Sequence, residues 1–132
     1  MDKKTEYQEW LKYAEDDLET AELLYRQYKK ALNIICFHCQ QAAEKYLKAF
    51  LVSKTISFEK THDLLNLYNL CVKVEESFSN LIKDCLKLNP YSVITRYPSE
   101  LELIEQDALL AINSVKCIKT HVSEKINASN FK

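Results

Sequence analysis

The feature that most constrains the fold of this chain is the complete absence of glycine from its 132 residues. Antiparallel sheets normally use glycine in the tight turns between strands, where positive φ angles are needed. Proline is also scarce and occurs only at positions 90 and 98. The chain is therefore expected to form helices joined by short polar loops. At this length we expect one domain, residues 1–132, with a single core.

Apolar residues recur with helical spacing in five segments, which predicts an all-α fold. The first segment carries one apolar stripe in alternating steps of four and three: Tyr7, Leu11, Ala14, Leu18, Ala21, Tyr25 and Tyr28. Thr5 and Gln8 form a candidate capping box at its start. The second segment, from about residue 30 to residue 53, is apolar over much of its surface. That pattern is typical of a central helix that several others contact.

The remaining three helices are predicted from their caps and stops. Thr61 is the expected N-cap of the third helix, with Asp63 in its first turn. The fourth helix is expected to stop at Asn89, before Pro90. Ser99 and Glu102 form a capping box that predicts the start of the fifth helix, with loops at 53–60 and 89–98. The expected architecture is a four-helix up-and-down bundle with an additional short helix.

Composition excludes several classes of protein. The net charge of −1 gives no overall attraction to nucleic acid or to an anionic membrane. No apolar run approaches the roughly 20 residues that span a bilayer, and the polar first ten residues are not typical of a signal peptide. The cysteines are odd in number and lie mostly at apolar helical positions: 36, 39, 71, 85 and 117. We therefore expect reduced, buried thiols in a cytoplasmic protein.

A metal site is not expected, although Cys36, His38 and Cys39 lie close together in the sequence. The two cysteines are one helical turn apart, His38 points to another side, and the chain has no second cysteine pair. The sequence also contains no glycine-rich phosphate loop and no Ser-His-Asp set. No cofactor is expected.

Three short motifs occur in a fixed order. Residues 37–51 read FHCQQAAEKYLKAFL, residues 60–64 read KTHDL, and residues 95–98 read TRYP. Together they resemble the HEPN family, small all-helical proteins of prokaryotes with relatives fused into larger eukaryotic chains. The resemblance covers nearly the whole chain. It implies either a ribonuclease toxin or a non-catalytic, nucleotide-associated partner, since the family contains both.

The ribonucleases of that family share an R-x4–6-H motif whose arginine corresponds to Arg96. Their histidine helps to activate the ribose 2′-OH, and the arginine stabilises the phosphate. The histidine would fall at 101, 102 or 103, where this chain has Leu101, Glu102 and Leu103. The tyrosine that follows the histidine in some toxins is also missing. This departure argues against a ribonuclease of the known type.

Five residues are candidates for a nucleotide-binding site. Arg96 beside a helix N-terminus would attract an anion, and Tyr97 could stack on a base; alternatively, the pair only fixes the loop. Lys45 and Lys48 share a helix face with Gln41 and Glu44 and would meet phosphate. Alternatively, Glu44 and Lys48 form an intrahelical ion pair. The fifth candidate is the histidine of the KTHDL motif.

His62 has two interpretations. It is the one candidate for a catalytic base that could replace the missing histidine. The structural alternative is a hydrogen bond from the start of the third helix to a neighbouring helix, at Glu44 or Gln41.

The resemblance also implies partners. We expect a non-catalytic homodimer that associates with a nucleotide or RNA and with a minimal nucleotidyltransferase, in a toxin–antitoxin-like or two-component system. The alternatives are a divergent, metal-independent ribonuclease toxin and a plain protein-interaction scaffold.

Overall fold

The structure is a computed structural model that describes residues 3–93 and 102–130. These residues form five α-helices and no strand, so the predicted all-α fold is confirmed. The helices are α1 (Lys3–Gln27), α2 (Leu32–Ser53), α3 (Leu64–Val74), α4 (Ile82–Leu88) and α5 (Glu105–Asn130). Two 3-10 segments, η1 (Glu76–Leu81) and η2 (Asn89–Ser92), flank α4. Within the described ranges, no helix has the length and apolar character to cross a membrane.

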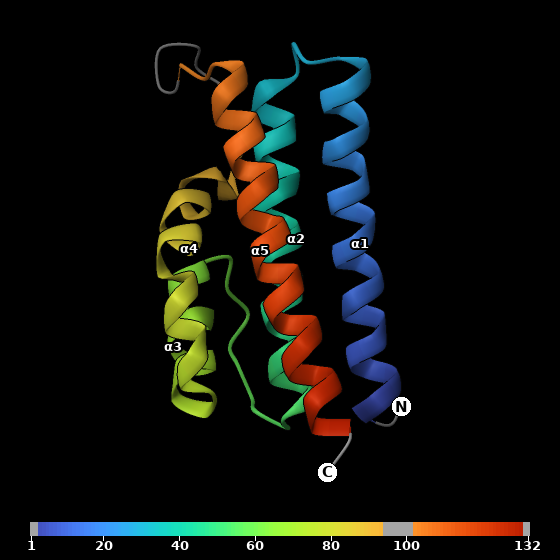
Figure 1. Ribbon diagram of the computed structural model, residues 1–132, viewed down its shortest axis with the longest axis vertical. Coiled ribbons are helices and arrows are strands. Elements are labelled where there is room, and N and C mark those ends of the chain that lie inside the picture. The colour runs from blue at the N-terminus through green and yellow to red at the C-terminus, as the bar shows by residue number, and fades with distance from the viewer. Residues whose placement is uncertain (1–2, 94–101, 131–132) are drawn as a thin grey trace.

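The second helix lies at the centre of the molecule. The long helices α1, α2 and α5 run side by side, and the short helices α3 and α4 lie together on the side away from α1 (Figure 1). α2 contacts each of the other four helices, as its apolar surface predicts.

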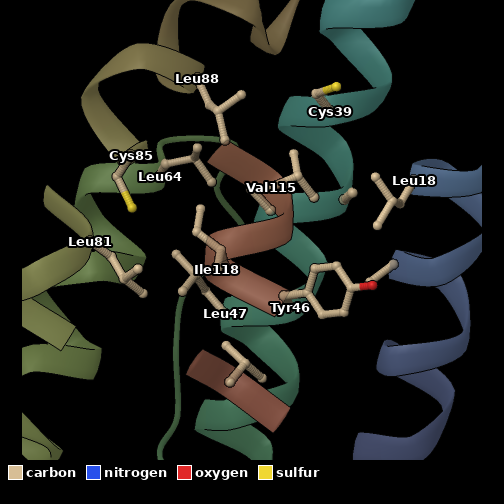
Figure 2. Close-up of a cluster of buried hydrophobic side chains, with 14 of the residues drawn as sticks. Leu18, Cys39, Tyr46, Leu47, Leu64, Leu81, Cys85, Leu88, Val115 and Ile118 are labelled. Carbon is tan, nitrogen blue, oxygen red and sulfur yellow. The ribbon is translucent and has the colours of Figure 1, made fainter. Parts of the chain in front are cut away.

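The core forms where these helices meet (Figure 2). Its largest fully buried side chains include Tyr46, Leu47 and Phe50 of α2. The other elements contribute Leu18, Leu64, Leu81, Cys85, Leu88, Val115 and Ile118. Since burial of a large apolar side chain stabilises a fold by about 1.5–3 kcal/mol, this cluster holds all five helices together. Cys36, Cys39, Cys71 and Cys85 are free thiols within it, as predicted, and Cys117 is exposed.

The end of α2 turns the chain back along the bundle. The Thr55 N–H donates to the Val52 carbonyl at 3.0 Å, and the Ile56 N–H donates to the Leu51 carbonyl at 2.9 Å. This pair of bonds is the Schellman motif, which places one residue in the left-handed region. That residue is Thr55, with a φ of 59°. A β-branched residue is unusual there, because the position favours glycine.

After this turn, residues 54–63 run back beside α2 to about half its height (Figure 1). α3 therefore starts near the middle of α2 and runs in the same direction (Figure 1). The predicted N-cap of α3 is corrected, because Asp63 caps the helix and accepts from the Leu65 N–H at 2.9 Å. Thr61 instead accepts from the Asp63 N–H at 3.0 Å, which supports the cap from outside the helix.

Two further predicted helix starts are wrong. α1 already includes Lys3, so Thr5 lies within the helix and is not its N-cap. Residues 102–104 are not helical, and α5 begins at Glu105, so Glu102 does not close a capping box. Asp107 takes that role, because its Oδ2 accepts from the Ile104 N–H at 2.9 Å. Pro98 and Ser99 lie outside the described residues.

Candidate functional site

A buried carboxylate on α2 organises the side chains that the sequence singled out. The Glu44 side chain is only 3% exposed, yet it has two partners. One oxygen accepts from the Lys48 ammonium at 3.0 Å, and the other lies 2.9 Å from Nδ1 of His62. Both structural alternatives from the sequence, the Glu44–Lys48 pair and the His62–Glu44 bond, are therefore present.

Lys48 belongs to the interior of this cluster. Its side chain is 8% exposed, and its ammonium lies 5.3 Å from the ring centre of Trp10 and 5.8 Å from that of Phe58. The two rings attract the cation by their negative faces, and Glu44 neutralises its charge. Lys48 therefore holds one oxygen of Glu44 in place, and the other oxygen of Glu44 holds the imidazole of His62.

His62 lies at the surface end of the same chain of contacts. Its side chain is 72% exposed. Because an ionised carboxylate can only accept a hydrogen bond, Nδ1 carries a proton toward Glu44. Nε2 is then the nitrogen that can bind a ligand or exchange a proton with it.

The buried Gln40 also fixes the position of His62, and sequence reasoning missed it. Its side-chain NH2 donates to the His62 carbonyl at 2.9 Å, and its oxygen accepts from Gln41 at 2.7 Å. Gln40 is fully buried. The sequence could have indicated this role of Gln40, because Gln40, Glu44 and Lys48 are spaced by four residues and therefore lie on one face of α2.

Lys45 lies on the neighbouring face of α2, toward α1. Its ammonium forms an ion pair with one oxygen of Asp17, and His38 Nδ1 lies 2.9 Å from the other. Asp17 therefore contacts both Lys45, which the sequence predicts as a phosphate ligand, and His38, which the sequence analysis considered as a metal ligand and rejected. No group of three His, Cys, Asp or Glu side chains among the described residues could hold a metal ion.

The cysteines beside this site are unsuited to chemistry. Burial raises the pKa of the Cys36 thiol to about 12, and it also raises the pKa of Cys39. Thiols that stay protonated at neutral pH neither attack substrates nor ligate metals readily. Their role is packing in the core.

Asn89 connects the start of α3 to the end of α4. Its carboxamide oxygen accepts from the Leu64 N–H at 2.9 Å, and its NH2 donates to Asp63 at 3.2 Å. The second half of the chain thus returns to the turn that carries His62. Arg96 and Tyr97 follow soon after Asn89 in the sequence, but both lie outside the described residues.

Comparisons with known proteins agree with this architecture. Residues 7–125 match the model of the HEPN domain family. The structure of an archaeal HEPN homologue superimposes with a TM-score of 0.72 at 25% identity, covering 91% of this chain and 97% of that one. A protein of Thermus thermophilus gives a TM-score of 0.72 at 26% identity, covering 90% and 97%. No curated protein matches the sequence.

Proposed function

Since the chain belongs to the HEPN family, we propose that it is a non-catalytic HEPN module that binds a nucleotide or RNA beside a minimal nucleotidyltransferase. The observation that carries the proposal is the sequence after Arg96. Leu101, Glu102 and Leu103 occupy the positions where the ribonucleases that the chain resembles have their histidine. The arginine that would bind phosphate is present, and the base that would start cleavage is absent.

The ligand site that we propose centres on His62 and Arg96. Asn89 hydrogen-bonds Asp63, the residue next to His62, and Arg96 follows Asn89 by seven positions. An arginine and a histidine near each other suit an anionic group such as phosphate. Tyr97 would stack on the base, and Lys45 would add positive charge once a ligand competes with Asp17. Lys48 would act from the interior, by holding Glu44 and so His62.

The partners come from the family rather than from this chain. We propose that two copies form a homodimer, and that the associated nucleotidyltransferase carries out the chemistry in a toxin–antitoxin-like or two-component system. Sedimentation of the purified chain at several concentrations tests the dimer. A species of one-chain mass at all concentrations would contradict it.

The experiment for ligand binding is calorimetric titration with ATP, GTP and a short single-stranded RNA, followed by analysis of the RNA products. Wild type should bind at least one of the three, and Arg96→Ala and His62→Ala should each weaken binding at least tenfold. Lys116→Ala, which removes an exposed lysine of α5, is the matched control and should bind normally. If wild type binds none of them, the proposed nucleotide site is wrong and the interaction scaffold is favoured.

A second candidate function, a divergent ribonuclease, is favoured by one observation. His62 is exposed and its Nδ1 is held by a buried carboxylate, the arrangement that orients a general base. This hypothesis predicts RNA cleavage that His62→Ala abolishes, together with toxicity on expression. Intact RNA and harmless expression of wild type would refute it.

A further inference from the structure

An open groove of about 460 Å³ lies between residues 57–61 and one face of α3. The first wall contains Phe58 and Glu59, and the second contains Asn66, Asn69, Leu70 and Lys73. His62 does not line this groove, although Phe58 of its first wall also contacts Lys48 of the nucleotide site proposed above.

The first wall offers backbone groups for hydrogen bonding. Residues 57–59 are neither helical nor part of a turn, and the segment from α2 to α3 is drawn out along the bundle (Figure 1). In the described part of the chain, no backbone group of residues 57–60 bonds to another backbone group. A drawn-out segment whose N–H and C=O groups are unpaired can add a second strand beside it.

The second wall offers two asparagine side chains that can donate and accept hydrogen bonds, as the backbone groups of the first wall can. Asn66 and Asn69 are both exposed, and they lie on one face of α3 because three residues make about one helical turn. Neither carboxamide has a hydrogen-bond partner among the residues that the structure describes. A carboxamide carries both donors and an acceptor, as a peptide group does. The half-buried Phe58 and Leu70 provide apolar contacts between the two polar walls.

The charge of the groove decides between a peptide and a nucleic acid. Its charged lining residues are one glutamate, Glu59, and one lysine, Lys73, which cancel. A nucleic-acid site needs several cations for the phosphates, and this groove lacks them. We propose that the groove binds an extended peptide segment of a partner protein. The peptide is uncharged over its central residues and carries apolar side chains at alternate positions, because those point to one side of a strand.

The proposal is tested by selecting peptides against the full chain. A library of random dodecapeptides displayed on phage is selected on wild type, and the Asn66→Ala/Asn69→Ala double variant is kept out of the selection for the comparison that follows. The selected peptide is then titrated by fluorescence anisotropy. It should bind the double variant at least tenfold more weakly than wild type, and Asn113→Ala, which changes an exposed asparagine of α5, should bind as wild type does.

Hydrogen exchange locates the bound peptide. The amides of residues 57–60 should exchange at least tenfold more slowly in its presence. The proposal is overturned if no peptide is enriched, if the protected amides lie elsewhere, or if short single-stranded RNA protects residues 57–60 and the peptide does not. The substituted side chains are exposed, so the variants should fold as wild type does. An unchanged circular dichroism spectrum and an unchanged Tm will confirm that each variant is folded.

Discussion

At residue 55 the chain adopts a left-handed conformation without glycine, with a φ of 59° at a threonine. That conformation costs a non-glycine residue about 1–2 kcal/mol, and glycine avoids the cost but has more freedom to lose on folding. We therefore predict that Thr55→Gly raises the free energy of unfolding by roughly 0.5–1 kcal/mol. Urea denaturation of wild type and variant measures the difference.

The matched control is Thr120→Gly, at an exposed position inside α5. Glycine is a poorer helix former than threonine, so this variant should lose roughly 0.3 kcal/mol. If the free energy of unfolding rises in Thr55→Gly and falls in Thr120→Gly, the gain at residue 55 comes from its left-handed backbone conformation. A loss of stability in Thr55→Gly would contradict the argument.

The buried Glu44 is the second residue with a predictable effect. Glu44→Ala leaves the ammonium of Lys48 buried without its carboxylate, and breaking a buried pair in this way costs about 3–5 kcal/mol. The double variant Glu44→Ala/Lys48→Met removes both charges and keeps an unbranched side chain between Trp10 and Phe58. We expect it to recover at least half of the loss in thermal and urea denaturation.

The single variant Lys48→Met completes a double-mutant cycle for this pair. If the losses of the two single variants simply add in the double variant, Glu44 and Lys48 are not energetically coupled. The cluster would then not hold His62 in the way that we describe.

At the level of elements, the helices were predictable and their ends were not. Local spacing is enough to predict an amphipathic helix, and it also predicted the Glu44–Lys48 contact. The start of α3 depends on contacts from Gln40, Glu44 and Asn89, which are distant in the sequence. Thr61 and Asp63 are both good capping residues, and only these distant contacts select Asp63.

The partners of Asp17 on α2 were hidden from the sequence, although the His62–Glu44 bond was among the predicted alternatives. Asp17 lies 28 residues from Lys45 and 21 from His38, and nothing local pairs them. The register between α1 and α2, which brings them together, follows from packing of the whole core. Only a contact within one helix, such as the pair at positions 44 and 48, could be derived from spacing alone.

The junction of α5 with η1 should make stability depend on pH. His121 packs edge-on against Phe78 at 4.6 Å and lies 2.9 Å from the Ser77 hydroxyl. Burial, and then Lys125, lower the pKa of His121 below its ordinary 6.5, while Glu124 and Glu75 oppose the shift. The unfolded chain therefore takes up a proton at a higher pH than the folded chain. His121 makes its full contribution to the free energy of unfolding above pH 6.5. That contribution is lost as the pH falls toward the lower pKa that His121 has in the folded protein.

We predict that His121→Phe, which keeps an aromatic ring against Phe78, loses less stability than wild type between about pH 7.5 and pH 5. Urea denaturation at a series of pH values measures the two profiles. His38 and His62 are present in both proteins, so their effects cancel in the difference. Parallel profiles would contradict the prediction.

At the scale of the whole molecule, the buried cysteines test whether the chain unfolds as one unit. Cys36 and Cys39 lie on α2, Cys71 lies on α3, and Cys85 lies on α4, yet all four belong to one core cluster. Burial raises the pKa of each thiol, that of Cys85 to about 12. In the native protein only the exposed Cys117 should therefore react quickly with a thiol reagent.

Raising the urea concentration should expose the four buried thiols in a single transition, because a small domain with one core unfolds cooperatively. Brief labelling at each urea concentration, followed by mass spectrometry of peptides, reports each cysteine separately. Cys117→Ser is the control and should remove the fast-reacting thiol without moving the transition. If Cys71 and Cys85 react at lower urea than Cys36 and Cys39, α3 and α4 unfold before the α1–α2–α5 layer. The single core would then consist of two units, and the surface around His62, which depends on the start of α3, would be lost with the weaker one.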